Sequence, residues 1–307
     1  MTTSGTLTSS NLLSDSDLTL NTAALERRKI LITGCSSGIG YYCAKQLHND
    51  GHIVVASCRK SEDVERLINE GLHCVQLDLD NSGSIVEGIR DTLTITNGEL
   101  DVLINNGAYG QPGAVEDLSR EVLEKQFSSN VFGTHELSIK LMKTLLASSC
   151  PRLIQISSVL GLVALRYRGA YVASKYALEG LTDTLRLELA DTKVKVSLIE
   201  PGPITSNFRK NAQAAFFANI DMNRSRHVDS YKRAVKRFDS DKPQPFTLSE
   251  EAVYKKIVHA IYAKRPKPRY YVTKPAYLFA VLRRLLSTAW LDKILLKISD
   301  GEDKRFD

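Results

Sequence analysis

Residues 33–40 read Thr-Gly-Cys-Ser-Ser-Gly-Ile-Gly, and their position between two different sequence patterns decides the fold. The run KILIT at 29–33 has the mostly apolar, β-branched character of a buried strand, and the residues after Gly40 have the period of a helix. Gly34 lets the chain turn off the strand, Gly38 lets backbone approach a ligand, and Gly40 lets the helix pack on the sheet. The start of that helix then faces an anion, so we predict that the turn holds the pyrophosphate of a dinucleotide, with Gly34, Gly38, Ile39 and Gly40 among the cofactor contacts. The alternative is a tight strand-to-helix turn without a ligand.

Strand-like runs alternate with helix-like segments along the rest of the chain. Strands are expected at 29–33, 52–57, 73–77, 100–105, 152–157, 194–199 and 269–273, and helices near 39–49, 61–70, 82–96, 119–147, 169–190 and 248–264. Strands that are apolar throughout are buried on both faces, which is typical of a parallel sheet covered by helices. We therefore predict an α/β fold, a doubly wound parallel sheet of the Rossmann type with about seven strands, helices on both faces, and ligands at the carboxyl ends of the strands.

Composition excludes several classes of protein. Of 307 residues, 43% are hydrophobic and 25% charged, which is unlike fibrous, coiled-coil or wholly disordered chains. The longest apolar runs are too short for a transmembrane helix, and the first residues lack the basic start and apolar middle of a secretory signal. The five cysteines are odd in number and widely spaced, without a CxxC pair. We therefore expect a cytoplasmic protein with core cysteines and no metal site.

Charge is distributed unevenly along the chain. Residues 1–206 carry 19 Lys and Arg against 24 Asp and Glu, a net of −5, whereas 207–307 carry 22 against 11, a net of +11. A basic last third suits an anionic surface such as lipid headgroups or nucleic acid. The alternative is a solvated basic face. We expect no nucleic-acid binding, because no known binding module is recognisable.

The ends of the next strands carry further candidates for the cofactor site. Arg59 and Lys60 follow the second strand, where NAD-binding folds usually have an acidic residue for the ribose 2′-hydroxyl. Two cations suit a 2′-phosphate instead, so we predict NADP(H) as cofactor, with Arg59 as the principal contact of that phosphate and Ser36 or Ser37 assisting. The alternative is a solvated basic turn. We also expect contacts at the ends of strands three and four, from Asp78 and Leu79 to the adenine and from Asn106 and Gly107 to the flat parts of the cofactor.

A tyrosine and a lysine four residues apart, Tyr171 and Lys175, are the candidates for acid–base chemistry. Residues at this spacing share one side of a helix, and Ser158 lies upstream at the end of strand five. A free tyrosine has a pKa of about 10 and exchanges protons poorly near neutral pH. An ammonium ~4.5 Å away, at an effective dielectric constant of ~20, favours the phenolate by roughly 3.7 kcal/mol, or about 2.7 pKa units. We therefore predict that Lys175 brings the pKa of Tyr171 near 7.

The same Tyr-x-x-x-Lys spacing occurs twice more, at Tyr41/Lys45 and Tyr270/Lys274. Tyr41 falls inside the first predicted helix and Tyr270 in the last predicted strand. Neither has a hydroxyl residue placed like Ser158. We therefore interpret both of these pairs as structural.

Five ordered motifs resemble the short-chain dehydrogenase/reductase (SDR) family over roughly residues 28–273. They are TGCSSGIG at 33–40, Asn130 in FSSNVFG, Ser158 in ISSVLG, YVASK at 171–175 and EPGPI at 200–204. More narrowly, ITGCSSGIG, CRKSEDVERL, RGAYVASKYALEG and VSLIEPGPI resemble bacterial NADP-dependent aldehyde reductases related to retinol and hydroxysteroid dehydrogenases. The chain departs from the family pattern where Asn-Asn-Ala-Gly reads Asn-Asn-Gly-Ala and where the threonine after Pro-Gly is Ser206.

The resemblance implies a role for each matching residue. Tyr171 is implied as acid–base, Lys175 as its partner and a ligand of the nicotinamide ribose, Ser158 as a hydrogen-bond donor to the reacting oxygen, and Asn130 as the holder of a water in a proton relay. The nicotinamide would be lined by Pro201, Gly202, Ile204 and Ser206. Helices 119–147 and 169–190 pair subunits in many relatives, so a homodimer or homotetramer is expected by analogy.

The resemblance also divides the chain into three parts. We expect a disordered tail at 1–26, a catalytic domain at 27–274 with a substrate lid at 203–247, and a basic amphipathic extension at 275–307. The extension could be one or two interfacial helices at the inner face of the membrane, or it could pack on the cleft or a second subunit. Either arrangement favours lipophilic substrates.

We therefore expect an NADP(H)-dependent oxidoreductase that interconverts a lipophilic aldehyde or ketone and its alcohol. Two alternatives remain, a steroid- or retinol-type alcohol dehydrogenase and a non-catalytic NADP-binding sensor of the same fold. The four residues Asn130, Ser158, Tyr171 and Lys175 count against the sensor, because a sensor has no need of them.

Overall fold

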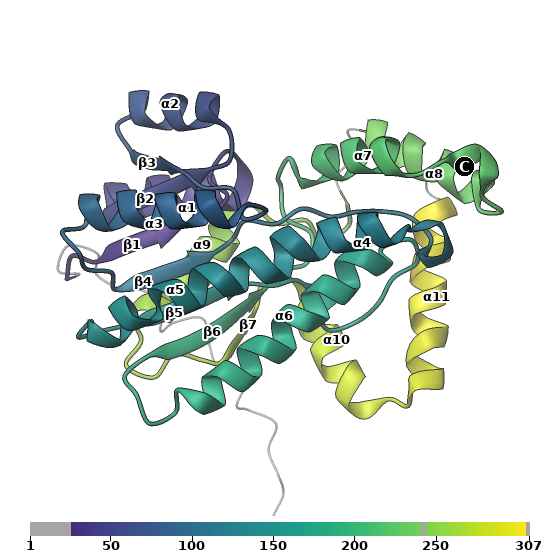
Figure 1. Cartoon of the computed structure of the whole chain (residues 1–307). Coiled ribbons are helices and arrows are strands. Elements are labelled where there is room, and N and C mark those ends of the chain that lie inside the picture. The colour runs from purple at the N-terminus through teal and green to yellow at the C-terminus, as the bar shows by residue number, and fades with distance from the viewer. Residues whose placement is uncertain (1–25, 241–243, 305–307) are drawn as a thin grey trace, which may run out of the picture.

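The computed structural model describes residues 26–240 and 244–304, and it has a central parallel sheet of seven strands (Figure 1). The strands run in the order β3-β2-β1-β4-β5-β6-β7, and every pair of neighbours is parallel. Their bounds are β1 Lys29–Ile32, β2 Ile53–Cys58, β3 His73–Gln76, β4 Val102–Asn105, β5 Arg152–Ile156, β6 Lys195–Glu200 and β7 Arg269–Tyr271. The predicted doubly wound sheet is confirmed. The predicted tail at 1–26 lies outside the described residues, apart from Glu26.

Helices cover both faces of the sheet because successive strand residues point to opposite sides. In β1, Ile30 and Ile32 join one apolar cluster, whereas Leu31 joins the other. The first cluster is closed by α1 (Gly38–Asn49), α2 (Ser61–Asn69) and α9 (Glu250–Tyr262). The second is closed by α3 (Ser82–Ile95), α5 (Thr134–Ala147) and α6 (Gly169–Glu188). Order reverses between β1 and β4, so the crevice that binds ligands in such folds opens at the carboxyl ends of these strands.

The single helix predicted at 119–147 is wrong in its middle. The chain forms α4 (Arg120–Phe127), a π-helical turn at Ser128–Gly133, and then α5. Gly133 shows why backbone geometry matters at this turn, since a Cβ atom there would lie 1.8 Å from the Leu79 carbonyl oxygen. A π-helical turn shifts the register of the side chains that follow it, and here it contains Asn130.

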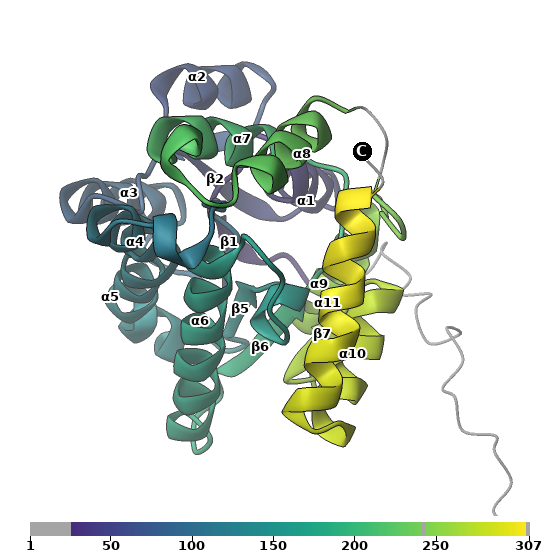
Figure 2. The same ribbon diagram turned by 90° about the vertical axis from the view of Figure 1, so that its right-hand side faces the viewer.

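Two helix pairs lie outside the sheet layers. The segment predicted as a lid contains α7 (Phe208–Asn219) and α8 (Val228–Asp239), and α10 (Lys274–Leu285) and α11 (Thr288–Lys304) follow β7 (Figure 2). Of the one or two helices expected in the extension, the structure has two. No helix within the described ranges combines the length and the apolar character that crossing a bilayer requires.

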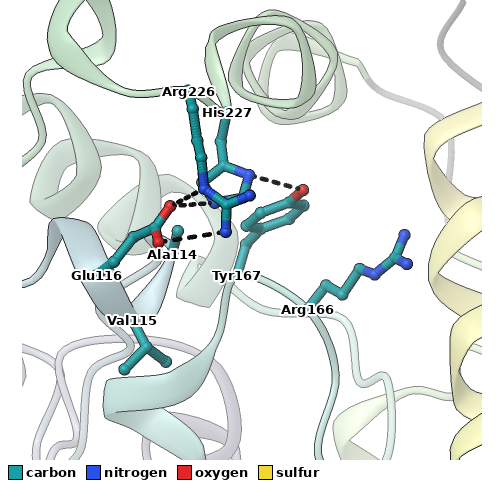
Figure 3. Close-up of a pocket in the computed structure, with 7 residues that line it drawn as sticks. All are labelled: Ala114, Val115, Glu116, Arg166, Tyr167, Arg226 and His227. Atoms are coloured by element: carbon teal, nitrogen blue, oxygen red, sulfur yellow. Dashed lines mark hydrogen bonds and ion pairs between the residues drawn. The ribbon is translucent and has the colours of Figure 1, made fainter.

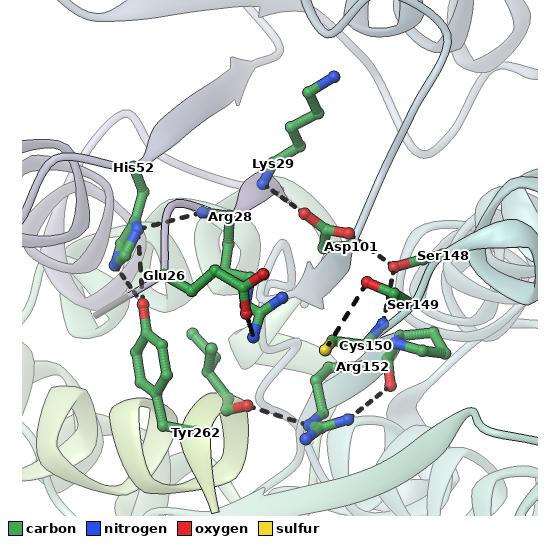
Figure 4. Close-up of polar contacts among 12 residues, drawn as sticks. Glu26, Arg28, Lys29, His52, Asp101, Ser148, Ser149, Cys150, Arg152 and Tyr262 are labelled. Atoms are coloured by element: carbon green, nitrogen blue, oxygen red, sulfur yellow. Dashed lines mark hydrogen bonds and ion pairs between the residues drawn. The ribbon is translucent and has the colours of Figure 1, made fainter. Parts of the chain in front are cut away.

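Polar contacts tie the strands together at the edge opposite the crevice (Figure 4). Asp101 accepts hydrogen bonds from the Lys29 amide (2.9 Å) and the Ser148 hydroxyl (2.6 Å), which joins β1, β4 and the end of α5. The guanidinium of Arg152 donates to the carbonyls at the end of α9, including that of Ala260 (3.1 Å). These hydrogen bonds within the protein stabilise the amino-terminal edge of the sheet. Ligands in this type of fold bind at the opposite, carboxyl-terminal edge.

Candidate active site

The turn between β1 and α1 is shaped for a ligand with close backbone contacts. Gly34 and Gly38 have φ angles of 71° and 59°, in the left-handed region that favours glycine. A Cβ atom on Gly40 would lie 2.3 Å from the Gly34 carbonyl oxygen, so no side chain fits there. The N-cap of α1, Ser37, makes no side-chain capping hydrogen bond, and the first turn holds no acidic residue. The amides at this helix start are therefore suited to an anion, as a dinucleotide pyrophosphate requires.

Asn106 braces this glycine turn from behind. Its side-chain amide donates to the carbonyls of Thr33 (2.9 Å) and Gly34 (3.1 Å), and the Thr33 hydroxyl accepts from the amides of Asn106 (3.0 Å) and Gly107 (2.9 Å). A Cβ atom on Gly34 would lie 2.6 Å from the Gly107 Cα atom. The departure from the usual Asn-Asn-Ala-Gly order therefore places the glycine where the two loops touch.

The ends of β3 and β4 also meet at this edge. Asp78 is partly buried, and its side chain accepts from the Asp80 amide (3.0 Å) while its own amide donates to the Ser84 hydroxyl (2.9 Å). Leu79 packs on Gly107, where an added Cβ atom would lie 2.9 Å from its Cδ1 atom. Both residues predicted for the adenine thus line the same loop cluster.

Arg59 and Lys60 are both exposed at the end of β2. A third cation, which the sequence reasoning missed, lies closer to the glycine turn. Arg66 of α2 donates to the Ser36 carbonyl (2.7 Å) and is also paired with Asp63 (3.2 Å). The sequence did indicate Arg66 indirectly, because it lies in the helix that directly follows Arg59 and Lys60.

The structure brings Ser158, Tyr171 and Lys175 together. Tyr171 and Lys175 lie one turn apart in α6, and Ser158 is the N-cap of a short helix at Val159–Gly161 that follows β5. Ser158 hydrogen-bonds to the Tyr171 phenol. The Lys175 ammonium is 5.7 Å from the centroid of the Tyr171 ring and donates to the Ile156 carbonyl (2.8 Å). Acid, cation and hydroxyl therefore share one site at the carboxyl edge of the sheet.

The predicted fall of the Tyr171 pKa towards 7 is wrong for this arrangement. Burial raises the pKa of Tyr171 to about 12, and the hydrogen bond from Ser158 offsets only part of the rise. Burial also lowers the pKa of Lys175 to about 8, against the charge of Glu179. Desolvation disfavours the charged form of both groups, whereas the simple Coulomb estimate counted only their attraction. Tyr171 is therefore a protonated acid at neutral pH.

Asn130 is buried in the π-helical turn, and its side chain makes three hydrogen bonds within the protein. Its Oδ1 atom accepts from the Tyr109 amide (3.1 Å), and its Nδ2 atom donates to the Tyr109 carbonyl (2.9 Å) and the Ser174 hydroxyl (3.1 Å). Ser174 precedes Lys175, so Asn130 ties the π-helical turn to α6 next to Lys175.

The Pro-Gly element after β6 is tied to the residue that follows Ser158. The Pro201 carbonyl accepts from the Val159 amide (2.8 Å), next to Ser158. Gly202 packs so closely on Thr273 that a Cβ atom would lie 2.1 Å from its hydroxyl oxygen. The segment thus passes directly beside the predicted nicotinamide position.

The next residues cross from this site to the glycine turn. Ile204 pairs with Leu248 in an isolated parallel bridge, and a Cβ atom on Gly38 would lie 2.9 Å from that of Ser206. Phe208 packs edge-on against the Tyr171 ring, with 5.3 Å between centroids. The sequence placed Phe208 in the lid but did not predict its contact with the catalytic tyrosine, because the position of a covering segment depends on tertiary packing.

Comparison with known proteins decides the family. The sequence profile described as "short chain dehydrogenase" matches residues 28–216. The chain belongs to the SDR family. It is 40% identical over 281 residues to the "Uncharacterized oxidoreductase YbbO" of Escherichia coli (strain K12), covering 89% of this chain and 96% of the relative.

A further relative and a solved structure are also similar to this chain. The "NADPH-dependent 3-dehydrocapnine reductase" of Ornithobacterium rhinotracheale is 31% identical over 278 residues, covering 88% of this chain and 96% of the relative. A crystal structure of a short-chain dehydrogenase from Streptomyces avermitilis has the same fold, with a TM-score of 0.71 and 24% identity over 92% of this chain and 98% of that one. This chain is therefore an oxidoreductase of the SDR family.

A buried ionic cluster lies behind the catalytic lysine of this SDR protein. Arg269 of β7 contacts the carboxylates of Glu179, Asp183 (2.5 Å) and Glu200. Glu179 follows Lys175 by one helical turn. Glu200 is fully buried, and burial together with the charge of Glu179 raises its pKa to about 8. Asp183 is also paired with Arg186 (2.5 Å), and the burial of Glu200 beside Glu179 favours the protonated form of Glu200.

A hollow of about 440 Å³ lies beside the start of α6 (Figure 3). Glu116 spans it through ion pairs with Arg226 (2.5 Å) and His227 (2.7 Å), and Tyr167 packs edge-on against His227. Its full lining is Ala114, Val115, Glu116, Arg166, Tyr167, Arg226 and His227. Glu116, Tyr167, Arg226 and His227 contact one another, whereas Arg166 pairs with Asp300 (2.6 Å). The lining of this hollow does not include Ser158, Tyr171 or Lys175.

Proposed function

We propose that this SDR protein is an NADP(H)-dependent oxidoreductase that interconverts a lipophilic aldehyde or ketone and the corresponding alcohol. The observation that carries the proposal is the convergence of Ser158, Tyr171 and Lys175 at the carboxyl edge of the sheet, where the glycine turn also lies. We propose Asn130 as the fourth member of this catalytic set.

The protonation of these residues suits reduction. A bound nicotinamide supplies the hydride in this direction, and the chain supplies the proton. Tyr171 is protonated at neutral pH because burial raises its pKa to about 12, so it can donate to a carbonyl oxygen as negative charge develops there. The Ser158 hydroxyl hydrogen-bonds to that oxygen, and the Lys175 ammonium stabilises the phenolate that remains. In oxidation, the same groups act in reverse.

The cofactor preference rests on charge at the end of β2. Arg59 and Lys60 are exposed where an acidic residue would accept from a free ribose hydroxyl, and two cations favour a 2′-phosphate. A relative that covers most of the chain is named NADPH-dependent, which supports the same preference. We propose that the cofactor contacts are Gly34, Ser36, Ser37, Gly38, Ile39, Gly40, Arg59, Lys60, Asp78, Leu79, Asn106, Gly107, Tyr171, Lys175, Pro201, Gly202, Ile204 and Ser206.

The proposal of a lipophilic substrate rests on the aromatic residues of the segment that covers Tyr171. Phe208 contacts the catalytic ring, and Phe216, Tyr231 and Phe238 form an apolar cluster in the same segment, residues 203–247. A segment of this kind excludes water and favours an apolar body next to the carbonyl. We propose that it acts as the substrate lid, within a catalytic domain at 27–274.

We also propose a cytoplasmic homodimer or homotetramer. Phe132, Ile139 and Leu146 are exposed at intervals of seven residues from the π-helical turn through α5. This spacing places them along one side, as in a helix that packs against a second copy. Charges of both signs flank them, including the ion pair of Glu136 and Lys140 (3.6 Å).

The test is NADPH oxidation with aldehydes and ketones graded by chain length and ring content, repeated with Arg59→Asp. We expect the catalytic efficiency to rise with apolar size, and the variant to lose at least about tenfold in NADPH efficiency relative to NADH, as expected when a charged contact to phosphate becomes repulsive. NADPH binding without turnover across the panel would favour the sensor alternative. An unchanged cofactor ratio would contradict the role of Arg59.

A further inference from the structure

Helices α10 and α11 carry exposed apolar side chains near the turn that joins them. On α10, Tyr277, Val281 and Leu285 follow one another at intervals of four and therefore share one side of the helix. Leu285, 76% exposed, is the most exposed large apolar residue of the described structure, and Trp290 of α11 is 62% exposed. Figure 1 shows this turn at the edge of the molecule, away from the sheet.

The opposite sides of both helices are already used for packing. Phe279 and Ala280 of α10 and Leu295 of α11 are buried against Leu162 and Val163, in the loop that follows Ser158. The helix pair is therefore held to the body by its inner side. The outer apolar side chains have no part in that core.

Positively charged side chains of α11 lie on the same side of the helix as the exposed Trp290. Lys293 and Lys297 follow Trp290 by three and seven residues, which places all three on one side of α11, and the Lys293 ammonium lies 4.6 Å from the Trp290 ring centroid. The carboxylates near the end of α11 are paired with arginines of the loop before α6 instead. Asp300 pairs with Arg166 (2.6 Å), and Glu302 pairs with Arg168 (2.5 Å).

Little negative charge remains on the outer side. Asp292 is the other acidic residue between positions 274 and 302, and Arg284 stands exposed beside Leu285. Apolar side chains at a projecting turn, flanked by exposed cations and with two nearby carboxylates already paired with arginines, match the headgroup region of an anionic bilayer.

We propose that this surface docks the protein on anionic membranes. Tyr277, Val281, Leu285 and Trp290 enter the interfacial region of one leaflet, and Arg284, Lys293 and Lys297 contact lipid phosphates. These seven residues are called the hairpin surface below. The attachment is peripheral and electrostatic, so it weakens as salt screens the cations. The proposal does not depend on the proposed reaction.

A second copy of the chain is the rival occupant, and charge argues against it. Two identical surfaces that face each other bring like charges together unless each carries both signs. The stripe of Phe132, Ile139 and Leu146 meets that condition, because Glu136 and Lys140 lie beside it. The hairpin surface is predominantly cationic, so it suits a lipid surface and the α5 stripe suits a second copy.

The single tryptophan of the chain provides a direct probe, because Trp290 lies within the hairpin surface. The full-length protein is mixed with vesicles of phosphatidylcholine alone or with about one third phosphatidylglycerol, a fraction chosen to match a strongly anionic leaflet. We expect sedimentation with the anionic vesicles, a blue shift of tryptophan emission, quenching by brominated acyl chains, and loss of all three at high salt.

Matched variants separate the apolar and the electrostatic contributions. Leu285→Ser is compared with Leu187→Ser, which changes an equally exposed leucine on α6. Lys293→Glu/Lys297→Glu is compared with Lys143→Glu/Lys255→Glu, which makes the same change in net charge on α5 and α9. We expect each hairpin variant to weaken vesicle partitioning at least about tenfold, and each control to change it less than about twofold.

The outcomes are distinct from those of the enzyme assay. NADPH oxidation with a soluble short-chain aldehyde should persist in the hairpin variants, so a failure of docking and a failure of catalysis are recognised separately. Equal binding to neutral and anionic vesicles, or no change in Trp290 emission, would overturn the proposal. So would a blue shift without vesicles that grows with protein concentration, because a second copy would then cover the surface.

Discussion

Two Tyr-x-x-x-Lys pairs, on α1 and on α6, have the same spacing and different surroundings. On α1, Lys45 donates directly to the Tyr41 hydroxyl (3.1 Å), which in turn donates to Glu70 (2.6 Å). These contacts raise the pKa of Lys45. On α6, burial lowers the pKa of Lys175 to about 8, and its ammonium binds a backbone carbonyl.

The difference shows that helical spacing brings a lysine to a tyrosine without making an acid–base pair. The pair on α1 is a surface ion cluster, in which solvent and Glu70 satisfy both groups. The pair on α6 is desolvated, faces Ser158 and lies under Phe208. The predicted structural character of the α1 pair therefore has a physical basis in its exposure, and each pair serves as a control for the other.

The largest expected effect is that of Tyr171→Phe. Removal of the hydroxyl eliminates the proton donor, so kcat for carbonyl reduction should fall by at least about a thousandfold. NADPH affinity, measured by fluorescence titration, should change little. Tyr41→Phe removes the same atom from the surface pair and should retain full kcat. Equal losses in the two variants would mean that neither tyrosine is the acid.

The second-largest effect is expected for the lysines of the two pairs, Lys175 and Lys45. Their substitutions should differ in their effect on kcat and on its pH dependence. Lys175→Met should lower kcat about a hundredfold, because the phenolate loses its counter-charge. In the unmodified protein, kcat for reduction should fall as pH rises through about 8, where Lys175 loses its proton. Lys45→Met should keep both the rate and the profile. A wild-type profile that stays flat to about pH 9.5 would contradict the assignment of this charge.

Phe208→Ala tests whether the aromatic ring that covers Tyr171 of the α6 pair contributes to substrate binding. Loss of the ring that packs on Tyr171 should raise KM for long-chain aldehydes by roughly tenfold, because burial of one aromatic side chain contributes about 1.5–3 kcal/mol. KM for acetaldehyde should change less than about twofold, since so small a substrate has little apolar surface to lose. Phe217→Ala, on the same helix and more exposed, is the matched control. Equal changes for large and small aldehydes would mean that Phe208 does not contact the substrate body.

The smallest effect concerns Arg66, which packs on Tyr41 and donates to Ser36. Arg66→Gln should weaken NADPH and NADH binding alike by about threefold, because it loosens the glycine turn that both cofactors use. Arg90→Gln, an exposed arginine of α3 paired with Asp91, is the control. A change in the NADPH to NADH ratio, measured by titration, would show that Arg66 contacts the 2′-phosphate itself.

The sequence reasoning succeeded where local pattern and chemistry coincide. All seven strands were predicted, because parallel strands buried on both faces are apolar throughout. It did not predict the π-helical turn that contains Asn130, because such a turn leaves helix periodicity almost intact on either side. It also failed for the Tyr171 pKa, because desolvation depends on what covers the ring, and Phe208 comes from a segment 37 residues further along the chain.

The amino-acid sequence by itself determined the sheet, the glycine turn and the identity of the residues at the carboxyl edge of the sheet. These features depend on backbone propensity and strand burial, which neighbouring residues in the chain determine. Only the tertiary structure decided which Tyr-Lys pair is desolvated, that Arg66 supports the cofactor turn, and which sides of α10 and α11 face outward. These properties arise between segments far apart in the chain, where burial, and not spacing, sets the energy of a charge or an apolar side chain.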